Sequence, residues 1–73
     1  MSDHLLKNTI KVQRAVKDWT QEELARSVGV TRKTINTIEN GVYVPSTYLA
    51  LKIAKAFGVT VETVFQLVED EAE

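Results

Sequence analysis

Apolar residues recur at helical spacing along most of this sequence, whereas the sustained apolar–polar alternation typical of strands is rare. Leu6 and Ile10 stand four residues apart and Arg14 continues their row, which predicts a first helix over residues 5–17. Near the other end, an i, i+3, i+4, i+7 series after Thr60 predicts a last helix, and its members are Val61, Val64, Phe65 and Val68. Helical periodicity therefore predicts a helix near each end of the sequence.

Three further helices are bounded by cap residues and glycines. Their expected limits are Thr20 and Gly29, Thr31 and Asn40-Gly41, and Ser46 and Gly58. Glu23, three residues after Thr20, completes a capping box. The positions expected to face inward are Leu24, Ala25, Val28, Ile35, Ile38, Leu49, Ile53, Ala54 and Phe57. Because Pro45 keeps the residue before it out of the α region, residues 42–45 are predicted to form an extended loop.

These five helices leave no linker, repeat or low-complexity stretch between them. The sequence therefore predicts one all-α domain over residues 1–68, followed by an acidic, disordered tail at residues 69–73. A chain of 73 residues buries only about 60% of its unfolded surface. It also has no cysteine, which excludes a disulfide or a thiolate metal site. The core must be efficient, or a partner subunit must contribute to it.

Charge is distributed unevenly, although the formal net charge is only −1. Residues 1–58 carry all nine Lys and Arg against five Asp and Glu, which gives +4. Residues 59–73 carry five acidic residues and no basic one, which gives −5 and restores the total of −1. The basic part permits contact with nucleic acid, since domains that bind nucleic acid are usually basic.

The third helix departs from the charge rule that the well-marked helix starts at Thr20 and Thr60 obey. Glu22 follows Thr20 and Glu62 follows Thr60, whereas Arg32 and Lys33 follow Thr31. A cation at the positive end of a helix costs a few tenths to about 1 kcal/mol. A local rule broken without visible compensation is where a function is expected, and the phosphate backbone of DNA is the obvious anion.

At about 100° per residue, the polar residues of the third helix gather on one side, opposite the apolar ones. The polar arc consists of Arg32, Lys33, Asn36, Thr37 and Asn40, and the opposite face of Ile35 and Ile38. Arg and Lys suit guanine O6 and N7, Asn suits adenine N6 and N7, and Thr contacts a base edge or a thymine methyl. The arc is either a DNA-reading surface or an ordinary solvated face.

No constellation of residues supports catalysis, a metal site or a cofactor. His4 is the only histidine, and no serine has a basic neighbour positioned to activate it. The sequence has neither an apolar run of about 20 residues nor a signal-peptide pattern. We therefore expect a cytoplasmic protein that is not an enzyme.

Segments of this chain resemble the lambda-repressor/Cro-like helix-turn-helix family, also called the xenobiotic-response-element family. They are TQEELA, VGVTRKTINTIENG, Pro45 and LALKIAKAFGV, and the resemblance covers residues 7–66. The resemblance implies a five-helix fold with the helix-turn-helix at helices 2 and 3. It also implies binding of operator DNA as a homodimer, with the third helix in the major groove.

The resemblance also implies roles for individual residues. Base readers would be Arg32, Lys33, Asn36 and Thr37, and phosphate contacts would come from Gln21, Thr31 and Asn40. Gln21 would also brace the third helix, and Arg14 would form a buried pair with Glu39 that ties the first helix to the third. Two further candidates for phosphate contact rest on chemistry alone: Lys11, which a solvated face explains equally well, and Tyr43, which loop packing also explains.

The last predictions concern the oligomeric state and the binding partner. Leu67 falls off the inward stripe of the last helix, so it is either a dimer contact, together with Val61 and Phe65, or a merely exposed leucine. The favoured hypothesis is a dimeric, sequence-specific transcriptional regulator, a repressor, on a palindromic double-stranded operator. The alternative is a protein-interaction module, such as an antitoxin or a coactivator.

Overall fold

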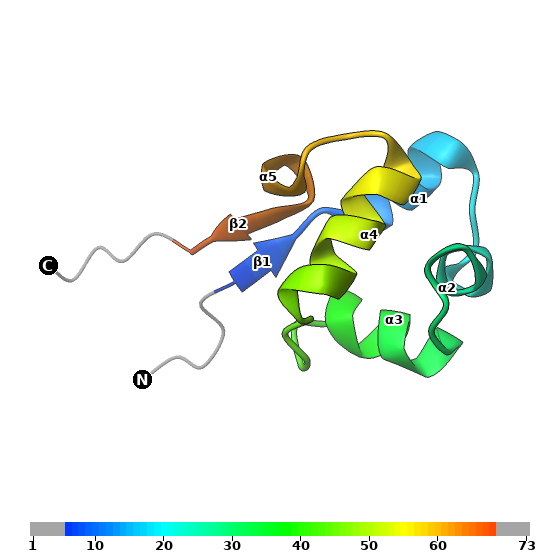
Figure 1. Ribbon diagram of the computed structural model, residues 1–73, viewed down its shortest axis with the longest axis horizontal. Coiled ribbons are helices and arrows are strands. Elements are labelled where there is room, and N and C mark those ends of the chain that lie inside the picture. The colour runs from blue at the N-terminus through cyan, green and yellow to red at the C-terminus, as the bar shows by residue number, and fades with distance from the viewer. Residues whose placement is uncertain (1–5, 69–73) are drawn as a thin grey trace, which may run out of the picture.

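Five helices follow one another along residues 6–68, the part of the chain that the computed structural model describes (Figure 1). They are α1 (Ile10–Lys17), α2 (Gln21–Val28), α3 (Arg32–Glu39), α4 (Thr47–Phe57) and α5 (Val61–Val64). The predicted five-helix architecture is therefore confirmed. The acidic tail at residues 69–73 and His4 lie outside the described residues.

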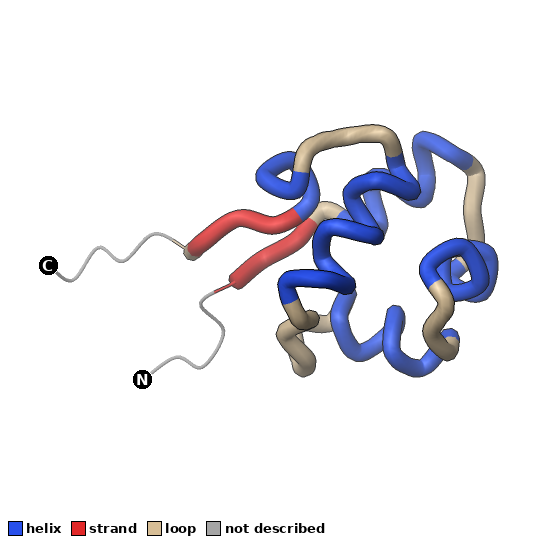
Figure 2. Tube along the Cα trace, viewed as in Figure 1, coloured by secondary structure: helices blue, strands red, loops and turns tan. Residues whose placement is uncertain are grey.

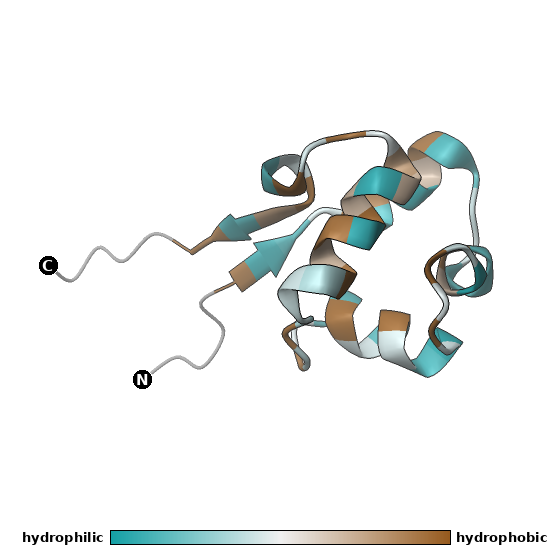
Figure 3. Ribbon diagram, viewed as in Figure 1, coloured by the Kyte–Doolittle hydropathy of each residue, from teal (hydrophilic) through white to brown (hydrophobic). Residues whose placement is uncertain are grey.

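The core lies between the helices, with α4 packed against α1, α2 and α5. All nine positions expected to face inward are buried, which confirms the helical phase of α2, α3 and α4. Ile10, Val64 and Phe65 join them from the two ends of the described chain. The helices accordingly carry both hydrophobic and hydrophilic bands in Figure 3.

The expected caps and terminators are present. Thr20 and Glu23 form the reciprocal capping box, and the Ser46 side chain accepts a hydrogen bond from the first turn of α4. Gly29 and Gly58 end α2 and α4 with φ of 78° and 75°, a left-handed conformation that only glycine adopts without strain. Local chemistry therefore determines where these two helices end.

Both ends of the described chain differ from the prediction, because residues on each side of the helices pair as strands (Figure 2). β1 (Leu6–Asn8) runs antiparallel to β2 (Phe65–Leu67), with Leu6 opposite Leu67. The prediction of one helix over residues 5–17 is therefore wrong for residues 6–9. The last helix is also shorter than predicted, since it ends at Val64.

Two side chains explain why the first helix begins late. Asn8 Oδ1 accepts a hydrogen bond from the backbone N–H of Ile10 (3.0 Å), which satisfies a free donor at the helix start. The backbone N–H of Thr9 donates to the carbonyl of Val64 (2.8 Å), and the Thr9 hydroxyl donates to the carbonyl of Thr63 (2.7 Å). The chain before Ile10 is thus held to the end of α5 and not in a helical turn.

Within residues 6–68, no helix combines the length and the apolar character that crossing a membrane requires.

Candidate nucleic-acid interface

The turn between α2 and α3 sets the two helices across each other. Gly29 ends α2 in the left-handed conformation, and the backbone N–H of Val30 donates to the carbonyl of Ala25 (3.0 Å). Thr31 then caps α3. Figure 1 shows the result: α2 is seen nearly end-on while α3 runs across the view. Both helices bury their apolar sides in the same core, which leaves the opposite side of α3 at the surface.

That outer surface carries the polar arc. Arg32, Lys33, Asn36 and Asn40 are exposed, whereas Ile35 and Ile38 are at most 1% exposed. Thr37 is half-buried, and its hydroxyl donates to the carbonyl of Thr34 (2.9 Å). The Thr37 hydroxyl hydrogen is therefore engaged within the helix.

The first turn of α3 holds no acidic residue. Thr31 Oγ1 accepts a hydrogen bond from the backbone N–H of Thr34 (3.2 Å), and the two threonine hydroxyls lie 3.0 Å apart. Among residues 6–68, neither Arg32 nor Lys33 forms an ion pair. The cations thus sit uncompensated at the positive end of the helix, an arrangement that favours an anion from outside the described chain.

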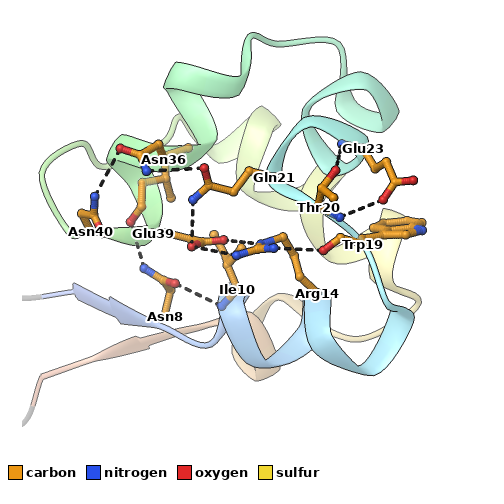
Figure 4. A network of polar contacts seen from close by, with 11 residues as sticks. Asn8, Ile10, Arg14, Trp19, Thr20, Gln21, Glu23, Asn36, Glu39 and Asn40 are labelled. Carbon is orange, nitrogen blue, oxygen red and sulfur yellow. Dashed lines mark hydrogen bonds and ion pairs between the residues drawn. The ribbon is translucent and has the colours of Figure 1, made fainter.

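A polar network anchors the other end of α3 (Figure 4). The Arg14 guanidinium binds the Glu39 carboxylate through Nε and, at 3.3 Å, through Nη2. Arg14 Nη1 also donates to the carbonyl of Trp19 (2.9 Å). The Arg14–Glu39 pair that the family resemblance implies therefore joins α1 to α3, with side chains only 16% and 7% exposed.

The same network reaches the polar arc through Gln21, the first residue of α2. Gln21 Nε2 donates to Glu39 Oε1 (3.1 Å), and Gln21 Oε1 accepts from Asn36 Nδ2 (3.4 Å). Asn36 Oδ1 in turn accepts from Asn40 Nδ2 (3.3 Å). The structure thus brings Gln21, Asn36 and Asn40 together on one surface, in contact with the buried ion pair.

Asn8 is a structural residue that the sequence did not reveal. Its Nδ2 donates to the carbonyl of Ile38 (2.9 Å), while its Oδ1 accepts from Ile10. The Ile38 carbonyl also accepts a hydrogen bond from the backbone N–H of Gly41 (3.0 Å), so Asn8 adds a second one and ties β1 to the last turn of α3. Because its partner is 30 residues away, no local pattern indicates this role.

Tyr43 and Lys11, the two candidate phosphate contacts that the family resemblance does not imply, lie in different parts of the fold. Tyr43 is 48% exposed and lines an open depression of about 410 Å³ beside α3. The other lining residues are Thr31, Lys33, Thr34, Thr37 and Val42. Lys11 is exposed on α1 and has no hydrogen bond or ion pair to α3 within the described residues. Tyr43 therefore belongs to the surface around α3 by position.

The three residues expected at a dimer surface differ in how far they are exposed. Leu67 is 79% exposed on β2, Val61 packs partly against the core, and Phe65 is a core residue at 9% exposure. Phe65, the first residue of β2, packs in the hydrophobic core of this chain. Its assignment to a dimer surface is corrected accordingly, and Leu67 remains.

Together, five helices, a helix-turn-helix at α2 and α3, and an outward face with cations and amides define a module of the DNA-binding class. A family model described as helix-turn-helix matches residues 10–64. An uncharacterized HTH-type transcriptional regulator of Methanocaldococcus jannaschii is 52% identical over 66 residues, which are 90% of this chain and the whole of that protein. A second one, YgzD of Bacillus subtilis, is 52% identical over 65 residues, 89% of this chain and 98% of that protein.

A solved structure is similar as well. The hypothetical transcription factor NHTF from Neisseria superposes with a TM-score of 0.70 at 31% identity over 74% of this chain. This chain spans 62% of that protein's length. The chain belongs to the helix-turn-helix family of DNA-binding transcription regulators, which is not a family of enzymes.

Proposed function

We propose that this protein regulates transcription by binding a specific double-stranded operator as a homodimer, with α3 of each protomer in the major groove. The observation that carries the proposal is the outer face of α3. It presents two cations and two amides, holds no carboxylate and lies opposite the buried Ile35 and Ile38. A helix of this kind fits the major groove, where these groups match the edges of guanine and adenine.

Roles divide between base reading and phosphate binding. Arg32, Lys33 and Asn36 read base edges, and Thr37 turns its methyl group to a thymine. The proposed phosphate contacts come from the helix-turn-helix and from its neighbours in the chain: Gln21, Thr31, Asn40, Tyr43 and Lys11. Such contacts fix the register of the protein on DNA, whereas base contacts carry the sequence information.

A direct test is selection of bound sequences from random duplexes, followed by fluorescence anisotropy with the selected operator. Arg32→Ala should weaken operator binding by about 1–3 kcal/mol and relax the preference at one base pair. Lys55→Ala removes the same charge from the exposed side of α4 and should change neither. Full affinity and selectivity of Arg32→Ala would show that Arg32 does not read the operator.

The salt dependence of the same binding reaction tests the phosphate contacts. Each phosphate neutralised by Lys or Arg releases counterions, so the logarithm of the affinity should fall linearly with the logarithm of the salt concentration. Lys11→Ala should reduce the slope by about one, because Lys11 is the cation that we assign to a phosphate. Lys33→Ala should leave the slope nearly unchanged, because we assign Lys33 to a base edge, and a reduction by about one would reassign it to a phosphate.

The dimer is supported by the exposed leucine of β2. A homodimer binds two half-sites about one helical turn apart, so the selected operator should be palindromic. Leu67→Ser should lower the dimer fraction in analytical ultracentrifugation. Val16→Ser is the matched control, because Val16 on α1 is equally exposed (77% against 79%). An unchanged dimer fraction in Leu67→Ser would remove Leu67 from the interface.

We further propose that the protein acts as a repressor, because occupying a promoter blocks other proteins without any further contact. A reporter gene preceded by the selected operator should be expressed less when the protein is present. Increased expression would reverse the sign of regulation and leave the DNA-binding proposal intact.

A further inference from the structure

Four side chains form a hydrogen-bonded chain from the buried ion pair to the exposed end of α3. Its members are Glu39, Gln21, Asn36 and Asn40, with successive N···O distances of 3.1, 3.4 and 3.3 Å. Figure 4 shows it running from the Glu39 carboxylate, beside Arg14, to the amides at the surface. We call this set the amide relay. The amide relay connects Glu39, which stays buried in the proposed complex, with Asn36, which we propose reads a base.

The direction of the amide relay is set at its buried end. The Glu39 side chain is 7% exposed and is held by Nε and Nη2 of Arg14. An ionised carboxylate accepts hydrogen bonds and donates none. The partner of Glu39 must therefore be the NH₂ group of Gln21, which turns the carbonyl oxygen of Gln21 toward α3.

The orientation of the Gln21 amide determines the orientations of the next two side chains. Because Gln21 offers an oxygen, Asn36 must donate to it with Nδ2, and Asn36 Oδ1 then faces Asn40. Asn40 completes the series by donating its own Nδ2. An amide that is free in solution turns either end to a neighbour at little cost. In the amide relay one turned amide would set two oxygens or two NH₂ groups against each other.

Asn36 keeps enough capacity to bind a base. Its NH₂ group has a second N–H, its oxygen has a second lone pair, and the residue is exposed. One donor beside one acceptor matches adenine, which offers the N7 acceptor and the N6 donor in the major groove. Guanine offers two acceptors, N7 and O6, which an amide of fixed direction does not satisfy.

We propose that Glu39 is a positioning residue for DNA specificity: it fixes the direction of the Asn36 amide and thereby commits α3 to adenine at one base pair of each half-site. The inference rests on the proposed function, since it assumes that α3 reads the major groove. It goes further in naming a residue that touches no base and still selects one.

The test compares the affinity for the selected operator with that for operators carrying guanine in place of the adenine. In the wild-type protein the adenine should be preferred by about five- to 150-fold, the discrimination of a good bidentate contact. Asn36→Ala should abolish the preference at this base pair. Glu39→Gln, which can either donate or accept, should lose most of the same preference and keep those at the other positions.

Glu23→Gln is the matched control, because it makes the same chemical change in the capping box of α2, away from the amide relay. It should keep the adenine preference. If circular dichroism shows that Glu39→Gln is unfolded, Gln21→Met replaces it, since this change interrupts the amide relay and retains the Arg14–Glu39 pair. Loss of a Gln21 phosphate contact alone would weaken binding to both operators equally, whereas loss of the relay removes the difference between them.

A second readout needs no DNA. In the free protein, the side-chain NH₂ signals of Asn36 and Asn40 in nuclear magnetic resonance spectra should shift in Glu39→Gln, or in Gln21→Met, and not in Glu23→Gln. Unshifted signals would overturn the amide relay whether or not the protein binds DNA. If the signals shift and no duplex is selected, the proposed function fails and the specificity role of Glu39 fails with it. A selected operator whose adenine preference survives in Glu39→Gln and Gln21→Met would refute that role alone.

Discussion

α2 and α3 have the same length and the same kind of cap, but opposite charges in the first turn. Each has eight residues and a threonine cap whose side chain accepts a backbone N–H. In α2, Glu23 returns a hydrogen bond to the backbone N–H of Thr20 (2.8 Å). In α3 the equivalent residue is Thr34, which has no carboxylate to return one. α3, whose first turn carries Arg32 and Lys33, thus lacks the second hydrogen bond of a capping box.

The difference between the two helices separates stability from function. The first turn of α2 follows the charge rule for a helix start, and the first turn of α3 breaks it with Arg32 and Lys33. Both helices nevertheless bury their apolar faces in one core. Acidic residues would stabilise both helix starts, and the cations of α3 therefore agree with the proposed contact to DNA.

The largest effect on stability is expected from the buried side chains that α2 and α3 both contribute to the core. Leu24 of α2 and Ile35 of α3 are both 0% exposed. Leu24→Ala and Ile35→Ala should each lower the free energy of unfolding by about 2–5 kcal/mol, because each leaves a cavity in the core. Urea unfolding followed by circular dichroism measures both. A loss well under 1 kcal/mol for Ile35→Ala would show that α3 is not held by its buried face.

The caps should give an intermediate effect and distinguish the two helices by function. Thr20→Ala and Thr31→Ala should each cost about 1 kcal/mol of stability, with the larger loss at Thr20, where a capping box is broken. Only Thr31→Ala should also weaken operator binding, since Thr31 is proposed to contact phosphate. Thermal unfolding and anisotropy on both variants check this. Equal weakening of binding by the two would mean that it follows stability alone.

The smallest effect is expected on the outer side of α2. Arg26 and Glu22 form an exposed ion pair at 3.6 Å, with side chains 76% and 64% exposed. Arg26→Ala should change the free energy of unfolding by no more than about 0.5 kcal/mol, because water screens such pairs. Thermal unfolding at low and high salt measures it. A loss above 1 kcal/mol would give this surface pair a structural role that its exposure does not explain.

The sequence indicated the parts of the fold that local chemistry determines. Caps such as Thr20 and terminators such as Gly29 act within a few residues, and they were predicted correctly. The sheet was missed because the paired residues Leu6 and Leu67 are far apart in the sequence. In addition, Leu6 of β1 and Phe65 of β2 each also fit a helical series. Three-residue strands are too short for alternation to be recognised.

The candidate site was predictable to a similar degree. The exposed arc of α3 follows from helical spacing, since Ile35 and Ile38 fix the buried side. The link from Gln21 to Asn36 requires the angle at which α2 and α3 meet, which no spacing within one helix gives. The contact of Asn8 with α3 is hidden for the same reason.

The measurement that tests the central claim most directly reverses the charges of the α3 start. In the double variant Arg32→Glu with Lys33→Glu, each acidic residue should stabilise the positive end of the helix by a few tenths to about 1 kcal/mol. The same variant should lose operator binding. The double variant Lys52→Glu with Lys55→Glu changes the net charge equally on α4 and should retain most of the binding. A protein that is more stable and no longer binds the operator is the predicted result, and unchanged operator affinity in the α3 variant would contradict the account.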